Sequence, residues 1–190
     1  KLSGKDVAFT VNTKYPWEGT VSVKMAMADD TAFTYALRIP GWCCGTYSLK
    51  INGEVVDCQV QDGYAVLNRT WKNGDEITLE LPMDVRVMAA NPKVRADINK
   101  VAVTRGPVVY CLEEADNGKD LHLIQVSFDP EFFGGMSVIT VTGDVLKQDG
   151  STALYREDTE PVYEEKALKL IPYYAWANRG LNEMTVWMYR

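Results

Sequence analysis

The sequence predicts an all-β protein made of two consecutive antiparallel β-sandwich domains with little helix. Three observations lead to this prediction: apolar residues recur with a period of two, turn signals separate the alternating runs, and no segment carries a sustained helical stripe. Alternation places apolar side chains on one face of a sheet and polar side chains on the other. Short strands at this spacing are typical of a sandwich.

The first half of the chain shows the clearest alternation. The apolar positions that predict strands are Val7, Phe9 and Val11; Val21, Val23 and Met25; Phe33, Tyr35, Leu37 and Ile39; Ile77, Leu79 and Leu81; and Val85 and Val87. Asn52-Gly53 predicts a hairpin, because both residues accept a positive φ. Asn73-Gly74-Asp75 predicts a second hairpin, which joins strands over Tyr64–Trp71 and Ile77–Leu81.

A breaker at Asn91-Pro92 follows the last of these runs and predicts a domain boundary. The first sandwich is therefore expected over residues 1–94 and the second over residues 95–190. In the second half, Val101–Thr104 and Val108–Leu112 are expected as two strands that pivot on Arg105-Gly106-Pro107. Later strands are expected over Leu123–Val126, Ser137–Thr142, Lys166–Pro172 and Met184–Tyr189. The polar stretches Glu113–Asp120 and Asp144–Glu160 are expected as loops.

Charge and hydropathy exclude two classes of partner. The net charge is −6, the sequence pI is about 4.9, and no run of Lys or Arg is longer than a pair. Phosphate backbones attract basic patches, so nucleic acid is not expected as a partner. No apolar run approaches the roughly 20 residues that span a bilayer, so no membrane span is expected. The chain begins at Lys1 without a methionine, and we expect it to be part of a longer protein.

Polar residues that could carry chemistry are present but scattered. Paired carboxylates can cleave glycosidic bonds. The acidic candidates fall almost entirely in turns and charged loops, where solvated surface charge is the usual role: Glu113, Glu114, Asp116, Glu131, Glu157, Asp158, Glu160, Glu164 and Glu165. The single histidine, His122, excludes a multi-histidine zinc site and is expected to be structural or solvated.

The cysteines offer a weak alternative. Cys43 and Cys44 are adjacent, whereas zinc ligands are usually grouped as Cys-x-x-Cys pairs, and nothing in the sequence indicates that Cys58 and Cys111 complete a set of four ligands. Ordinary free thiols are therefore expected. No catalytic, metal-binding or cofactor-binding residue is predicted in this chain.

The aromatic residues remain as a possible binding surface. Trp17, Trp42 and Trp176 are the candidate carbohydrate contacts, because an indole can pack on the C–H face of a sugar ring. Sandwich cores also use Trp and Tyr heavily, so core packing is the competing interpretation.

A series of phrases, in this order, is more specific than periodicity. They are Tyr15-Pro16-Trp17-Glu18-Gly19; Leu37-Arg38-Ile39-Pro40-Gly41-Trp42; Gly63-Tyr64; Arg69-x-Trp71; Gly74-Asp75; Leu81-Pro82-Met83; Arg105-Gly106-Pro107-Val108-Val109-Tyr110-Cys111-Leu112-Glu113; Ile171-Pro172-Tyr173-Tyr174-Ala175-Trp176-Ala177-Asn178-Arg179-Gly180; and Met184-x-Val186-Trp187. Over nearly the whole chain this series resembles the C-terminal region of the β-L-arabinofuranosidases of glycoside hydrolase family 127.

The resemblance implies a bacterial parent enzyme with an N-terminal (α/α)₆ catalytic barrel followed by two β-sandwiches, and the sequence does not distinguish the cytoplasm from the periplasm as its compartment. It implies that the barrel holds a zinc-bound cysteine nucleophile and a glutamate acid/base. The barrel's Cys-Cys pair precedes Pro-Pro-Asn, whereas Cys43-Cys44 follows Ile39-Pro40-Gly41-Trp42, which is the sandwich motif. Cys43 and Cys44 are therefore not identified with the catalytic pair, and zinc is expected only in the absent barrel.

Three functions follow as hypotheses. The first is a non-catalytic accessory region that supports the catalytic barrel of its own parent chain or mediates the contacts of a homodimer, with the rigid turns Arg105-Gly106-Pro107 and Trp176–Gly180 as candidate docking elements. The second is a carbohydrate-binding module that uses exposed Trp and Tyr. The third is a self-contained thiol or metal enzyme built around Cys43-Cys44, which is the least favoured of the three.

Overall fold

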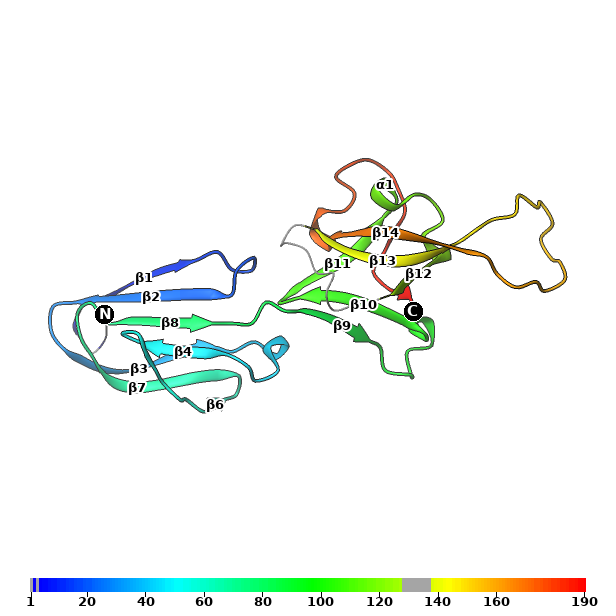
Figure 1. Ribbon diagram of the computed structural model, residues 1–190. Coiled ribbons are helices and arrows are strands. Elements are labelled where there is room, and N and C mark those ends of the chain that lie inside the picture. The colour runs from blue at the N-terminus through cyan, green and yellow to red at the C-terminus, as the bar shows by residue number, and fades with distance from the viewer. Residues whose placement is uncertain (1, 3, 128–137) are drawn as a thin grey trace. The chain divides into compact units, whose positions relative to one another are not determined.

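A computed structural model describes residue 2 and residues 4–127 and 138–190, and its regular secondary structure consists mainly of β-strands (Figure 1). The one α-helix among these residues is α1, Glu114–Asn117, and the remaining helical segments are short 3₁₀ turns. The expectation of an all-β chain with little helix is confirmed. None of the helices in the described residues is long and apolar enough to cross a membrane.

The chain divides into two compact units, residues 1–84 and 85–190. The boundary expected after residue 94 falls ten residues into the second unit. The reason is strand β9, Val85–Ala89, which pairs antiparallel with β10, Lys100–Arg105, and so belongs to the second unit. Asn91-Pro92 therefore lies in the connection between β9 and β10, within the second unit, and does not separate the two units.

The first unit contains two antiparallel sheets. A five-stranded sheet has the order β1-β2-β8-β4-β5 and a three-stranded sheet the order β3-β7-β6. The strands are β1 Val7–Thr13, β2 Thr20–Met27, β3 Thr31–Arg38, β4 Ser48–Ile51, β5 Glu54–Val55, β6 Val60–Gln61, β7 Tyr64–Trp71 and β8 Glu76–Glu80. Both sheets contribute to one apolar cluster, in which Met25 and Leu49 of the larger sheet meet Leu67 and Trp71 of the smaller one. The period-two pattern predicted this arrangement of faces.

The two Asn-Gly turns have different roles. Asn52 and Gly53 both have positive φ and join the paired strands β4 and β5, so the first predicted hairpin is confirmed. The second prediction is wrong, because β7 and β8 lie in different sheets. Asp75 is buried and accepts the backbone N–H of Lys72 at 2.8 Å, and its own carbonyl accepts the N–H of Met25. These bonds turn the chain from one sheet to the other.

The second unit is built on one eight-stranded sheet with the order β15-β11-β14-β13-β12-β16-β10-β9, in which β10 also pairs with β11. The remaining strands are β11 Val108–Glu113, β12 Ile124–Ser127, β13 Ile139–Leu146, β14 Tyr163–Pro172, β15 Met184–Thr185 and β16 Met188–Tyr189. Strands β10, β11, β14, β13, β12 and β16 therefore form a closed ring around a core that includes Val103, Tyr110 and Leu168.

This closed barrel corrects the expectation of a second sandwich. Strand β16 pairs with β10 on one side and with β12 on the other, so the last residues of the chain close the sheet on itself. Closure removes sheet edges, which otherwise expose unpaired backbone groups. Inward and outward residues alternate in the same way in barrels and sandwiches, so periodicity alone does not separate them.

The predicted elements of the second half are found with shifted bounds. The two strands around Gly106-Pro107 are confirmed as the pair β10 and β11. The expected loop Glu113–Asp120 instead contains α1, and Ser137 and Glu131 lie outside the described residues. Between β13 and β14 the chain leaves the barrel as a long loop, whose residues Leu154 and Tyr155 are 91% and 93% exposed (Figure 1).

Trp71 is the largest fully buried side chain of the first unit, and its indole N–H donates to the Phe33 carbonyl at 3.1 Å. Trp71→Ala should lower the free energy of unfolding of this unit by about 3–5 kcal/mol, because it leaves a cavity and removes the hydrogen bond to the Phe33 carbonyl. Chemical denaturation of the chain measures the loss. Val55→Ala is the control, because Val55 is 74% exposed and should change stability by less than about 0.5 kcal/mol. Equal effects of the two variants would contradict the placement of Trp71 in the core of the first unit.

Candidate functional site

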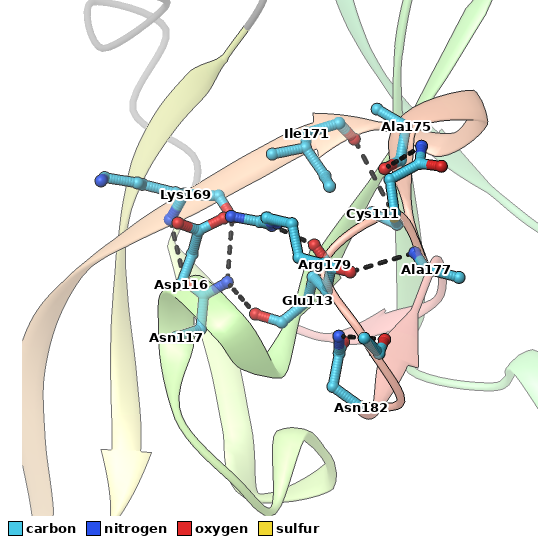
Figure 2. A network of polar contacts seen from close by, with 12 residues as sticks. Cys111, Glu113, Asp116, Asn117, Lys169, Ile171, Ala175, Ala177, Arg179 and Asn182 are labelled. Atoms are coloured by element: carbon cyan, nitrogen blue, oxygen red, sulfur yellow. Dashed lines mark hydrogen bonds and ion pairs between the residues drawn. The ribbon is translucent and has the colours of Figure 1, made fainter.

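A network of polar contacts surrounds Glu113 at the end of strand β11 (Figure 2). Glu113 is 0% exposed, although the sequence predicted solvated charge for it. The guanidinium of Arg179, in the segment after β14, donates to the Glu113 carboxylate. The same guanidinium donates to Asp116 Oδ2 of α1 at 2.7 Å. One cation thus joins the end of a barrel strand, a helix and a loop.

A backbone donor also binds the Glu113 carboxylate. The N–H of Ala177 donates to Glu113 Oε1 at 3.1 Å. Burial alone would raise the pKa of Glu113, but the hydrogen bonds from Arg179 and Ala177 outweigh it, so the pKa lies below its ordinary value. The hydrogen bond from Arg179 likewise lowers the pKa of Asp116. Both carboxylates are therefore ionised at neutral pH.

Asn117, which is buried in α1, ties the cluster to strand β14. Its side-chain amide donates to the carbonyls of Glu113 at 2.9 Å and Lys169 at 3.0 Å, and its Oδ1 accepts the Lys169 N–H at 2.8 Å. The ammonium of Lys166 donates to the Asn117 carbonyl at 2.7 Å. The side chain of Asn117 therefore provides Lys169 with the hydrogen bonds that a neighbouring strand would provide, and Figure 2 shows the bonds of Asn117 to Glu113 and Lys169 at the turn of α1.

This geometry does not provide a glycosidase acid/base pair. Such a pair needs one carboxylic acid with a raised pKa to protonate the leaving group and a second carboxylate across the scissile bond. Glu113 and Asp116 instead share one guanidinium, and the pKa of each is lowered. We name the set Glu113, Asp116, Asn117 and Arg179 the polar clasp, because its contacts hold the segment 173–183 against the barrel.

Cys43, Cys44 and Cys58 belong to the first unit, whereas Cys111 lies on β11 beside the cluster, and the chemistry of the four thiols does not favour catalysis. Burial raises the pKa of the Cys43 thiol, with a further contribution from Cys44, and burial next to Glu113 raises the pKa of Cys111 to about 11. Cys44 is exposed, and the Cys58 thiol donates to the Val66 carbonyl at 3.3 Å. Within residues 2, 4–127 and 138–190, no three His, Cys, Asp or Glu side chains are placed to hold a metal ion together. The cysteines described here thus do not fit the zinc centre that the resemblance implies for the catalytic barrel.

The three tryptophans proposed as sugar contacts occupy separate settings. Trp17 is 49% exposed. Trp42 is half-buried and stacks on Tyr15, with ring centroids 6.5 Å apart and planes at 19°. Both belong to the first unit. Trp176 belongs to the second unit, where it is half-buried and its ring lies 6.3 Å from that of Tyr173. Trp42 and Trp176 thus each have an aromatic neighbour within their own unit.

Sequence reasoning missed the polar clasp. Glu113 ends an alternating strand and begins an acidic run, so nothing local distinguishes it from surface charge. The one available signal is Arg179 within the phrase Trp176–Gly180, for which the sequence predicts a docking element. Its guanidinium is in fact bonded within the unit.

The fold and the clasp define an all-β chain of two units, the second a closed barrel fastened by internal ion pairs. Residues 85–189 match the family described as Glycoside hydrolase family 127 C-terminal domain. Residues 1–83 match Beta-L-arabinofuranosidase, GH127 middle domain. The chain belongs to glycoside hydrolase family 127, and the two matches meet where the two units do.

Individual relatives agree with this assignment. The non-reducing end beta-L-arabinofuranosidase of Bifidobacterium longum subsp. longum is 37% identical over 194 residues, which are 94% of this chain and 30% of that protein. A crystal structure of a family 127 beta-L-arabinofuranosidase from Geobacillus stearothermophilus T6 has a TM-score of 0.87 at 40% identity and covers 98% of this chain and 31% of that one. A beta-arabinofuranosidase structure of the same family has a TM-score of 0.80 at 36% identity, covering 97% and 32%. The chain therefore spans less than a third of the length of these relatives.

Glu113→Gln should destabilise the second unit by about 2–4 kcal/mol. Removing one partner of a buried ion pair is costly, but Arg179 is 41% exposed and keeps Asp116, which places the loss toward the lower end. Thermal unfolding followed by circular dichroism measures it. Glu157→Gln is the matched control, because Glu157 is an exposed carboxylate of the same unit and should have little effect.

The lowered pKa values of Glu113 and Asp116 predict acid sensitivity. The folded state binds fewer protons than the unfolded state, so this stability is complete above the ordinary values of about 4.5 and 3.8 and is lost as the pH falls through the lower folded values. Melting temperatures measured from pH 7 to pH 3 should fall for the unaltered chain. The fall should be shallower for Glu113→Gln, and parallel curves for the two proteins would contradict this role for the clasp.

Proposed function

We propose that this chain is the non-catalytic accessory region of a larger family 127 glycoside hydrolase and that it supports a catalytic (α/α)₆ barrel elsewhere in the parent chain. The observation that carries the proposal is an apolar strip on the first unit that its own second sheet leaves uncovered. The internal pairing of the polar clasp supports the non-catalytic part of the proposal.

The strip arises from a mismatch between the two sheets. The first unit is proposed to be a β-sandwich in which a five-stranded sheet faces a sheet of three strands. Strand β1 lies at the edge of the larger sheet, and the cross-strand partners of Val7, Phe9 and Val11 are the core residues Met27, Met25 and Val23. Because these pairs share a face, β1 points its apolar side chains toward the interior.

The smaller sheet covers only part of β1. The centroid of the Phe9 ring lies 6.1 Å from that of the Phe33 ring and 5.3 Å from that of the Tyr35 ring. Phe9 is nevertheless 41% exposed, and Val11 is 56% exposed. Tyr15 and Trp17 follow in the next turn and are 37% and 49% exposed. Exposed apolar side chains on an edge strand commonly mark a protein contact. The proposed occupant is the catalytic part of the parent chain, and a second copy of the chain is the alternative occupant.

The parent enzyme is proposed to release β-L-arabinofuranose residues, as the names of its relatives indicate. The reaction is assigned to the barrel and not to the 190 residues of this chain. Release of arabinose from an aryl β-L-arabinofuranoside should therefore require the parent protein. Turnover by the isolated chain, in the presence of zinc and reductant, would overturn the accessory role.

A matched pair of substitutions tests whether another part of the parent protein covers the apolar strip. Val11→Lys and Val55→Lys both place a charge at an exposed valine of the first unit, and each should change the melting temperature of the isolated chain little. In the full-length parent, Val11→Lys should cost about 2 kcal/mol or more, since the charge is buried at the contact, whereas Val55→Lys should remain neutral. Differential scanning calorimetry measures both.

Two outcomes distinguish the two proposed occupants of the strip, which are the catalytic part of the parent chain and a second copy of the chain. A Val11→Lys effect that appears in the monomeric parent supports the catalytic part as the occupant. An effect that appears only together with loss of a dimer, measured by sedimentation, identifies a second copy instead. Equal melting temperatures for the two parent variants would refute the strip as a contact surface.

A further inference from the structure

We infer that the second unit carries a binding site for a neutral sugar, centred on Trp187 and distinct from the polar clasp. The site is a cavity of about 390 Å³ that lies between the start of β10, the turn Leu121–Leu123 and the C-terminal segment. Its chemistry-bearing residues are Lys100, His122, Glu183, Trp187 and Tyr189. Its volume lies within the range of about 300–1,000 Å³ typical of small-molecule sites. This inference stands apart from the support role proposed above.

The charged groups of the cavity are held in place by the fold. The carboxylate of Glu183 accepts the backbone N–H of Leu121 at 3.1 Å. The backbone of Glu183 is itself bonded twice to Glu114, through its N–H to Oε2 and through its carbonyl, each at 3.0 Å. The Lys100 ammonium lies 5.0 Å from the centroid of the Tyr189 ring. Acceptor and donor are therefore both positioned before any ligand arrives, which lowers the entropy cost of binding.

Trp187 supplies the apolar surface. Its carbonyl accepts the hydroxyl of Thr185 at 2.9 Å, which fixes the turn between β15 and β16, and its side chain is half-buried in the wall of the cavity. Within the described residues, the indole N–H of Trp187 and the imidazole of His122 have no hydrogen-bond partner in the chain. Donors and acceptors thus remain available around one aromatic face.

A second hollow extends this site along the surface. It has a volume of about 610 Å³, shares Lys100, Thr185 and Trp187 with the first, and reaches Tyr173, which is 46% exposed. Two aromatic side chains are therefore available along one continuous depression. A ligand longer than one sugar ring would contact both.

The chemistry of the lining selects the class of ligand. A sugar ring presents C–H groups on its face and hydroxyl groups at its rim, which match an indole surrounded by an ammonium, a carboxylate and an imidazole. The positive charge of Lys100 is balanced by the negative charge of Glu183, and Asp97 lines the second hollow. The depression therefore has no excess of positive charge. Phosphorylated or polyanionic ligands need such an excess. A neutral glycoside is therefore favoured over a nucleotide or an acidic glycan.

Isothermal titration calorimetry of the 190-residue chain tests the inference with methyl β-L-arabinofuranoside and methyl β-D-galactopyranoside as neutral probes. D-glucuronate and inorganic phosphate are the charged comparisons. Saturable binding of at least one neutral glycoside in the millimolar range is expected, with weaker binding of the two anions. No saturable binding of either neutral probe, or tighter binding of the anions, would overturn the inference.

Variants locate the site. Trp187→Ala should weaken binding about tenfold or more, as expected for a central aromatic contact, and Glu183→Gln should weaken it several-fold. Trp17→Ala is the matched control, since Trp17 is a half-exposed tryptophan of the other unit, and it should leave the dissociation constant unchanged. If Trp187→Ala fails to fold, His122→Ala replaces it, because His122 is exposed. Loss of binding in Trp17→Ala with retention in the cavity variants would place the sugar elsewhere and refute the site.

Discussion

The carboxylate of Glu113 lies at the end of a barrel strand with none of its surface open to water, and a charge in that position needs a partner. Arg179 supplies the partner, although it is 66 residues distant along the chain. The pairing determines the course of the segment that follows β14, because Arg179 and Ala177 both bind the same carboxylate. Strand β15 then pairs with the end of β11, and β16 closes the barrel between β10 and β12. The ion pair thus organises the part of the chain that completes the fold.

The first unit follows a different constraint. Its core is supplied by two sheets of unequal width, and the larger sheet has more strands than the smaller one covers. The inner face of β1 is consequently left open at Phe9 and Val11. A protein of this size buries most of its apolar side chains internally, so an uncovered strip on an inner face is best explained by a neighbour that covers it. This is the physical basis of the proposed support role, and it agrees with the family relationship and with the small share of each relative that the chain spans.

The sequence predicted much of the β-structure, but not all of its connections. Alternation placed β1, β2, β3, β7 and β8 with small errors, and Asn52-Gly53 specified its hairpin because two residues with positive φ allow few other turns. The same reasoning failed at Asn73-Gly74-Asp75, where the buried Asp75 carries the chain from one sheet to the other. The candidate site was predicted less well, because the burial of Glu113 depends on Arg179, and no local pattern reports a partner so distant in sequence.

The sequence by itself determined the all-β class, the positions of most strands and, through its ordered series of phrases, membership of family 127. These depend on periodicity, turn chemistry and motif order, which are local or linear properties of the chain. Only the tertiary structure decided that the second unit is a closed barrel, that β9 belongs to it, and that Glu113, Asp116 and Arg179 meet. Sheet closure and charge pairing depend on which distant segments come together, because the same alternation of side chains serves a barrel and a sandwich equally well.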